Sequence, residues 1–505
     1  MMNEKGFAVT SLLYGAIALI LILFVVVISI MSTTKDLNGN FVDDVERSLN
    51  GYLDIYNESI SPQVPELVGD MIPVVFDGNT WVKADVSNAL NSWYDYEEQR
   101  WANVVTVSAA SRNSYKSAGV GTAISMGDIS AMFVWIPRYS YTLYNGIGVS
   151  GHGGSTASIS TPGAFDIKWV DNTVVDTGSA SYTGNSPSNW FTPPGFCFGN
   201  SCDNPSTRSS SSNRELNGIW VGKFETSVYD SDVNNLTNCN ETNTVANCNS
   251  ILPPTIKPDI TSWRNSSLIN YHNSIKTYMS GSNGTSHHGF TGSTYDAHLM
   301  KNTEWAVISY LSQSRYGKYG NEIYHGANKE VAINNCNLYI TGVGGDSVSS
   351  PASSESCSSN TYNTEKGQTA STTGNTTGVY DMSGGSFEWI MGNMKNTSGG
   401  FNPSASGFST LEAKYYNLYN RASRFNDYSN FIKGDATKDV VGFYNDHALM
   451  LNGSYESPWM IRGGHYYLGA INGVFNFYYA EGIHPIPSGG VFENVGVRIS
   501  LVPNK

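Results

Sequence analysis

The stretch GVYDMSGGSFEWIMG, residues 378–392, gives the clearest indication of how this chain folds. Ser383, Gly384 and Gly385 predict a tight turn, because glycine adopts backbone conformations that other residues avoid. Trp389 follows the turn and is expected to be a core aromatic. The turn and its tryptophan therefore mark an ordered part of the chain.

Four further segments have the same ordered character and lie on both sides of this stretch. They are FVWIPRYSY (133–141), GIWVGKFETS (218–227), MKNTEWAVISYLSQS (300–314) and MIRGGHYY to NVGVRISL (460–501). Gly, Ser and Asn dominate the sequence between them, which predicts long irregular loops at 145–215, 228–297 and 343–377.

Residues 300–314 predict a helix. Asn302 or Thr303 can cap it, and its apolar face would hold Trp305, Ile308 and Leu311.

Near the C-terminus, Arg498 is expected to pair with an interior carboxylate, either Glu388 or Glu304. The glycines after Arg462 allow a close backbone approach.

Taken together and in this order, the five segments resemble the formylglycine-generating-enzyme-like (sulfatase-modifying factor) family, whose fold is an elaborated C-type lectin-like domain. That family shows a YIGKYEVT-like strand, a TEAEWEYAAR-like helix, a GLYDMSGNVWEW turn and a closing RGGSW to GFR segment. Each has a counterpart here. The resemblance implies a C-type lectin-like domain over residues 131–505.

The resemblance does not extend to the catalytic residues of that family. In the formylglycine generators, two cysteines after the RGG turn bind copper and attack the substrate. Here the segment reads HYYLGAINGVFNFYYAEG, and no cysteine lies between 358 and 505. Tyr and Leu cannot replace thiolate ligands, so we expect no catalytic residues. A His-based iron oxidase is the enzymatic alternative, although His465 and His484 form no HxxxH or HxH pair.

The family also binds calcium, through backbone carbonyls and the Glu of its GNxWEW turn. The matching residue is Glu388, whereas the family's Asn is replaced by Gly385. Calcium needs about six to eight oxygen ligands, so one carboxylate is a weak indication. We expect no obligatory cofactor and leave calcium at Glu388 as an alternative.

In related C-type lectin-like proteins the C-terminal stretch is the ligand face. Here residues 465–494 are rich in Tyr and Asn, which supply rigid amphipathic area and adaptable hydrogen bonds in binding loops. We therefore predict a ligand-binding surface made of His465, Tyr466, Tyr467, Asn472, Asn476, Tyr478, Tyr479, His484 and Asn494. Some relatives are diversified by retroelements at such positions, and diversification is a hypothesis for this segment. Ordinary strand and loop packing is the alternative.

The six cysteines fall into three close pairs in Ser- and Asn-rich sequence. An even count with local spacing predicts disulfides formed in an oxidising compartment. Metal binding or redox chemistry is the alternative, but no CxxC motif or Cys/His cluster supports it. The expected pairs are Cys197–Cys202, Cys239–Cys248 and Cys336–Cys357.

The N-terminal residues 7–31, FAVTSLLYGAIALILILFVVVISIM, carry no charge and are long enough to cross a bilayer. A cleaved secretory signal would have a shorter apolar core. An amphipathic pattern continues beyond them, so residues 7–57 are predicted to form one long helix. We expect it to anchor the chain in a membrane, with the C-terminus outside the cell.

The start MMNEKGF resembles the class III signal of type IV prepilins. In that family a peptidase cuts after the Gly, here between Gly6 and Phe7, so that residues 1–6 would be a leader. The family's Glu at the fifth mature position is Ser11, which argues against a repeating filament subunit and fits a tip-located minor pilin. An unprocessed signal anchor is the alternative.

Prolines mark residues 58–65 as a linker. Residues 66–130 then read as a small β-rich unit, because MIPVVF, WVKADV and WANVVTV have strand composition and Asp77-Gly78 suits a hairpin turn. The predicted class is α+β, with the long N-terminal helix, the small β-rich unit and the C-type lectin-like domain in that order. Core packing is expected for Trp81, Trp93 and Trp101, and carbohydrate stacking is the alternative.

The composition of the chain excludes one class of function. Charged residues make up 14% of the chain, the net charge is −13, and no basic stripe is present, so we expect no nucleic-acid partner. We predict a membrane-anchored cell-surface binding protein, an adhesin or tip minor pilin, that recognises a surface protein or glycan. Other pilins are further expected partners. The alternatives are a structural minor pilin that caps a filament and a metal-dependent oxidase.

Overall fold

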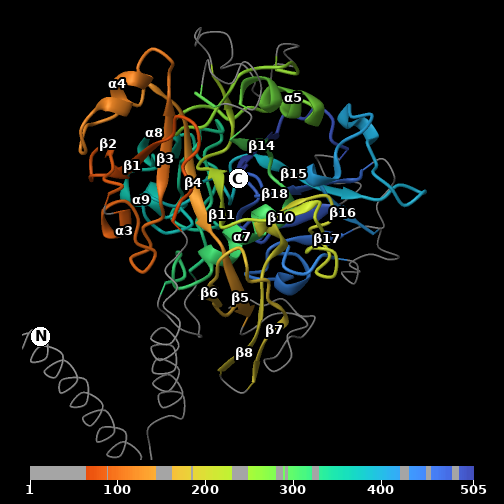
Figure 1. The fold of residues 1–505 in the computed structure, drawn as a ribbon. Coiled ribbons are helices and arrows are strands. Elements are labelled where there is room, and N and C mark those ends of the chain that lie inside the picture. Colours follow the sequence, from red (N-terminus) through yellow and green to blue (C-terminus); the bar gives the residue numbers. More distant parts are fainter. Residues whose placement is uncertain are drawn as a thin grey trace, which may run out of the picture. The chain divides into compact units, whose positions relative to one another are not determined.

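The computed structural model describes residues 64–87, 89–143, 162–183, 186–229, 248–279, 288–290, 294–320, 329–420, 431–450, 457–479 and 488–504. Over these residues the fold is mainly β-sheet (Figure 1). Its longest helices, α5 (Leu268–Tyr278) and α7 (Asn302–Ser312), have 11 residues each.

The fold class predicted from the sequence is therefore wrong. Most of the order in the described chain comes from hydrogen-bonded strands, whereas the α+β prediction gave a large share of the fold to one long N-terminal helix. The described residues include no helix that is both long and apolar enough for a membrane span. For the described residues, this finding contradicts the predicted single-pass anchor and the localisation derived from it. Residues 1–6, 7–31 and 7–57, with Gly6, Phe7 and Ser11, lie outside the described residues.

The largest sheet has seven antiparallel strands and brings together distant parts of the chain. Its order is β14 (Tyr295–Leu299), β21 (Ile499–Pro503), β11 (Gly218–Gly222), β4 (Ile129–Pro137), β3 (Asn103–Val107), β1 (Ile72–Phe76) and β2 (Trp81–Lys83). All nine residues of β4 are buried, which explains its continuous apolar and β-branched composition.

The strands expected in 66–130 are present as β1, β2 and β3, and the hairpin between β1 and β2 is confirmed. Asp77 makes its turn by accepting hydrogen bonds from the backbone N–H groups of Asn79 and Thr80. Trp81, Trp93 and Trp101 are buried, as predicted. These strands share the large sheet with β4, β11 and β21, so residues on both sides of the expected boundary at 130 are joined by one hydrogen-bonded sheet.

A second sheet of six strands is centred on β15 (Phe387–Met394), the strand that follows the turn at 383–385. The path runs β16 (Asn417–Tyr419), β15, β18 (Trp459–Arg462), β19 (Phe477–Tyr479) and β17 (Ala448–Met450), and β20 (Val495–Val497) also pairs with β15.

The remaining strands form smaller sheets. A four-stranded sheet has the order β6 (Phe165–Trp169), β5 (Tyr139–Leu143), β8 (Ser186–Phe191) and β7 (Thr177–Thr183). Two-stranded pairs are β9 (Cys197–Gly199) with β10 (Asn213–Glu215), and β12 (Ser227–Val228) with β13 (Pro254–Thr255). The short helices are α3 (Ala89–Ser92), α4 (Arg112–Ser117), α8 (Ser356–Ser359) and α9 (Glu365–Gln368).

Helix α7 confirms the helix predicted at 300–314, with two differences. Its N-cap is Lys301, one residue earlier than expected, and the Glu304 carboxylate accepts the Lys301 backbone N–H at 2.9 Å. All eleven helical residues are buried, so the apolar stripe is one part of a helix that is covered on every side.

The predicted partner of Arg498 is confirmed as Glu388. The guanidinium Nη2 and Nε donate to the two carboxylate oxygens at 2.6 and 3.0 Å, and both side chains are 0% exposed. Arg498 also donates to the carbonyls of Gly222 and Tyr380, each at 2.9 Å. One side chain thus joins the end of β11, the turn before β15 and the start of β21.

We predict that Glu388→Gln destabilises the protein by about 3–5 kcal/mol, because it removes the carboxylate that is hydrogen-bonded to the buried Arg498 charge. The double variant Glu388→Leu/Arg498→Met should cost less than the sum of the single variants Glu388→Leu and Arg498→Met. Urea unfolding measures both quantities.

The matched control is the ion pair between Lys366 and Asp346, whose side chains are 56% and 73% exposed. Lys366→Met should lower the free energy of unfolding by at most about 1 kcal/mol. Strict additivity of the two buried substitutions would contradict the coupling.

Candidate ligand-binding surface

The loop after β18 carries most of the predicted ligand residues. It begins with Gly463 and Gly464, whose φ angles of 82° and 73° lie in the region that favours glycine. A Cβ at Gly464 would lie 2.4 Å from the Cβ of Asn472. The close backbone approach expected after Arg462 is therefore present, and it folds residues 465–472 back on themselves.

His465 lies inside this loop, with 1% of its surface exposed. Its Nε2 is 2.8 Å from the hydroxyl of Tyr339, and its Nδ1 has no hydrogen-bond partner among the described residues. The rings of Tyr466 and Tyr467 lie 4.2 and 4.5 Å from the imidazole, between centroids. Burial, together with the positive charge of Arg264, lowers the pKa of His465 to about 3. The imidazole is therefore neutral at pH 7.

Asn472 and Asn476 are also buried, and their side chains hold the loop together. The Asn472 amide donates to the carbonyl of His465 at 3.0 Å, and the Asn476 amide donates to that of Ile471 at 2.9 Å. Each amide adds a second hydrogen bond to a carbonyl that also accepts a backbone N–H, from Leu468 at His465 and from His447 at Ile471. Their ligand role stays a prediction, and the structure adds a direct structural role.

Tyr466 and Tyr467 are the predicted residues that reach solvent here. Tyr466 is half-buried, and Tyr467 is 57% exposed. Their rings meet at 5.5 Å with an interplanar angle of 74°. Edge-to-face packing of this kind is favourable for aromatic rings and restricts their motion. The two tyrosines form a pair whose inner side rests on His465; below it is called the tyrosine pair.

The remaining predicted residues belong to β19, to the chain after it and to the turn before β20. Tyr478 and Tyr479 belong to β19, but their side chains lie outside the described set, as does all of His484. Asn494 lies half-buried in the turn before β20, and its carbonyl accepts the backbone N–H of Phe387 at 3.0 Å.

Two residues that support the loop were missed by sequence reasoning. Tyr339 bonds His465 and packs edge-to-face against Tyr466 at 5.0 Å, and the guanidinium of Arg264 lies 3.5 Å from the centre of the Tyr339 ring. The only sequence signal near Tyr339 is its position inside the cysteine-bounded segment 336–357. Nothing in the pattern around Arg264 indicates the stack.

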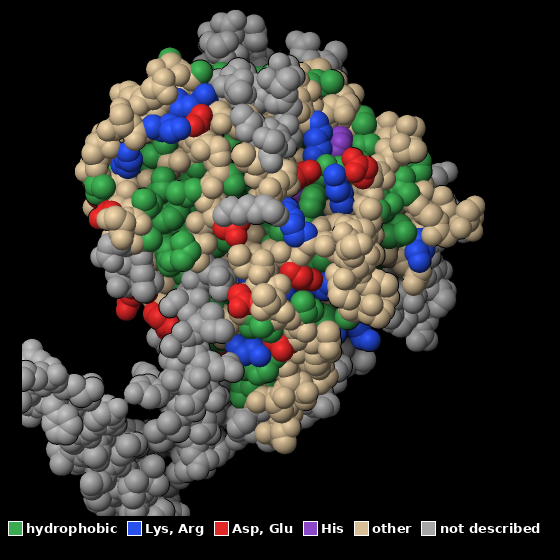
Figure 2. Space-filling model, viewed as in Figure 1, with side chains coloured by type: hydrophobic (Ala, Val, Ile, Leu, Met, Phe, Trp, Pro, Cys, Tyr) green, Lys and Arg blue, Asp and Glu red, His purple; other side chains and the backbone are tan. Residues whose placement is uncertain are grey.

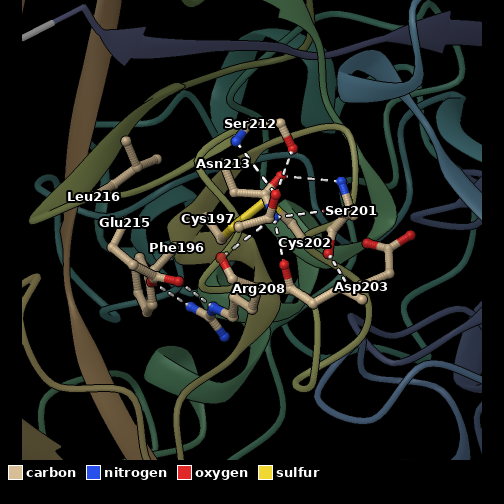
Figure 3. Close-up of a disulfide and its surroundings, with 12 residues drawn as sticks. Phe196, Cys197, Ser201, Cys202, Asp203, Arg208, Ser212, Asn213, Glu215 and Leu216 are labelled. Atoms are coloured by element: carbon tan, nitrogen blue, oxygen red, sulfur yellow. Dashed lines mark hydrogen bonds and ion pairs between the residues drawn. A yellow bond between two sulfur atoms is a disulfide. The ribbon is translucent and has the colours of Figure 1, made fainter.

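Two of the predicted disulfides are confirmed, Cys197–Cys202 and Cys336–Cys357. Cys248 is also disulfide-bonded, and Cys239, its expected partner, lies outside the described residues. Figure 3 shows Cys197–Cys202 at the start of β9, near the guanidinium of Arg208, which faces the carboxylate of Glu215 at 2.6 Å. This disulfide therefore belongs to a structural cluster.

Glu388 is the predicted calcium ligand, and Arg498 already occupies both of its oxygens. Glu225 fills the space next to Gly385: a Cβ there would lie 2.5 Å from Glu225 Oε1, and Ser386 donates its N–H and hydroxyl to this carboxylate. Burial raises the pKa of Glu225 well above its usual value, and Asp381 raises it further. Within the described part of the chain, no three His, Cys, Asp or Glu side chains are grouped to hold a metal ion.

Comparison with known proteins leaves the resemblances untested. No protein-family model matches the chain, and a search of curated proteins finds no significant match.

The buried imidazole predicts a specific pH dependence. The folded pKa of His465, about 3, is lower than the usual 6.5, so its contribution to stability is complete above pH 6.5 and is lost as the pH falls. Relative to His465→Gln, which does not titrate, the wild type should lose about 2 kcal/mol between pH 7.5 and pH 5. Urea unfolding of both proteins at the two pH values measures this difference. An equal pH dependence in both would contradict it.

Proposed function

We propose that this chain is a non-catalytic binding protein whose partner contacts the tyrosine pair. The observation that carries the proposal is the exposure of Tyr467, at 57%, on a ring stack fixed by the buried His465. Exposed tyrosines with restricted motion lose little conformational entropy on binding and are enriched at the centres of protein interfaces. The absence of the two family cysteines, noted in the sequence, is consistent with a non-catalytic role.

The shape of the surface favours a protein partner over a small molecule. Small-molecule sites are concave, with volumes of about 300–1,000 Å³. Two cavities found among the described residues measure about 80 and 10 Å³, and neither is lined by Tyr466 or Tyr467. The tyrosine pair is instead suited to insertion into a pocket on another protein. Binding to glycans alone is an outcome that the test below distinguishes.

Charge gives the surface no preference for polyanions. On the face in Figure 2, Lys and Arg side chains lie in small groups beside Asp and Glu, and most of the surface is neutral. Residues 465–479 contain no Asp, Glu, Lys or Arg. A charge-free aromatic centre is typical of a protein interface core, which supports the expectation of no nucleic-acid partner.

Retroelement diversification of residues 465–494 stays a hypothesis. The burial of some of their side chains limits the positions at which variation would leave the fold intact. Free variation is tolerated at exposed positions, whereas changes at buried polar positions such as Asn472 break internal hydrogen bonds. Diversity compatible with the fold would therefore concentrate at Tyr466 and Tyr467 rather than at the buried positions.

We predict that Tyr467→Ala weakens binding of the full chain about 30-fold, the effect of losing a hot-spot residue of about 2 kcal/mol. The assay is a protein array and a glycan array probed with wild type and variant, followed by titration of the strongest hit. Val120→Ala is the control, because Val120 is 64% exposed and belongs to the 66–130 region. Equal binding by wild type and Tyr467→Ala would remove the tyrosine pair from the site. Hits confined to glycans would replace the protein partner with a carbohydrate.

A further inference from the structure

The loop closed by the Cys336–Cys357 disulfide lies directly beside the loop that carries the tyrosine pair. The two loops contact one another at two places. At one, Tyr339 bonds His465 and packs against Tyr466. At the other, a Cβ built on Gly469 would lie 4.0 Å from the Cα of Ser349. The disulfide loop therefore borders the proposed partner surface at Tyr339 and at Ser349.

Tyr339 is held in an uncommon conformation. Its φ of 56° lies in the left-handed region, which costs a non-glycine residue about 1 kcal/mol or more. The surrounding contacts maintain it: its N–H donates to the carbonyl of Cys336 at 3.1 Å, and its own carbonyl accepts from Ser262 at 2.9 Å. The Arg264 guanidinium stacks on its ring. Several independent constraints thus fix the ring against Tyr466.

Leu338 is the exposed neighbour that this conformation leaves at the surface. It is 56% exposed, nearly the same as Tyr467 at 57%. An exposed leucine alone needs no explanation. Here it directly precedes a strained residue that packs against Tyr466, so its backbone adjoins the residue that supports the tyrosine pair.

We propose that Leu338 is a second contact residue for the protein partner and that Tyr339 is the residue that positions it. This inference rests on the proposed function and extends the surface from one loop to two. The disulfide Cys336–Cys357 then stabilises half of the binding surface.

The charges around these loops indicate the chemistry of the partner. Residues 337–357 include acidic side chains and no Lys or Arg. Lys366 neutralises Asp346, but Glu355 and Glu493 are exposed. The Glu493 carbonyl accepts a hydrogen bond from Arg264, which places this residue beside Tyr339. Because complementary potentials steer association, the surface fits a protein with an apolar pocket for Leu338 and Tyr467 and basic residues around it.

The test uses cyclic peptides selected from a random library on the full-length protein and counter-selected on the Tyr467→Ala variant. Peptides that pass both steps need the Tyr467 side chain for binding and therefore contact the tyrosine pair. We expect Leu338→Ala to weaken the best peptide about tenfold, and Val86→Ala, at 49% exposure in the 66–130 region, to leave its affinity unchanged. Raising the salt concentration should weaken the peptide if it carries the expected basic residues.

A second measurement needs no ligand. Tyr339→Phe removes the hydroxyl bonded to His465 but keeps the ring. Amide hydrogen exchange at Leu468 and Asn472, whose N–H groups bond the carbonyls of His465 and Gly469, should then accelerate several-fold. The Cys336→Ser/Cys357→Ser variant should accelerate hydrogen exchange at these two amides further.

The outcomes separate the two proposals. Peptides that lose affinity with Tyr467→Ala but not with Leu338→Ala, with unchanged exchange in Tyr339→Phe, would overturn the two-loop surface and leave the proposed function standing. A selection that yields no Tyr467-dependent peptide would overturn the proposed function itself.

Discussion

The buried ion pair between Glu388 and Arg498 is the interaction on which the rest of the described structure depends. It joins the central strand of the six-stranded sheet to the chain entering β21 of the seven-stranded sheet. A buried charge is unfavourable unless it is paired and its other hydrogen-bonding groups are satisfied. Arg498 meets this condition by donating also to carbonyls of residues 222 and 380. The pair therefore stabilises one relative position of β11, β15 and β21 against alternatives.

The rigidity of the candidate surface depends on this ion pair. Glu388 pairs in register with Arg462 on β18, and the Arg462 guanidinium donates to Asn302 at the start of α7 and to the carbonyl of Ala436. The loop with the tyrosine pair begins immediately after this strand. Trp305 of α7 then donates to the carbonyl of Val474 at 2.9 Å, which fixes the far side of the same loop. The loop is thus held at both ends by the sheet and helix that the ion pair organises.

Local features of the sequence predicted local structure well. The β1–β2 hairpin, helix α7 and two disulfides follow from turn residues, helical spacing and cysteine spacing. The partner of Arg498 was predictable because a buried arginine requires a nearby carboxylate. What the sequence did not reveal is lateral pairing: β3 pairs with β4. Period-two patterns show that a strand is buried, but not which strand lies beside it, so the region 66–130 was expected to form a unit of its own.

The candidate site shows the same limit at the level of side chains. Tyr, Asn and His at 465–476 have the composition of a binding loop, yet composition does not distinguish a side chain that faces a partner from one that satisfies the loop's own backbone. In the tight loop after two glycines, Asn472 faces inward and donates to the carbonyl of His465, and the His465 ring faces inward and bonds the hydroxyl of Tyr339. Tyr467 faces outward on top of them. The polar residues and the exposed ring thus act together, because an aromatic side chain offers a fixed contact surface only when the loop beneath it is itself fixed.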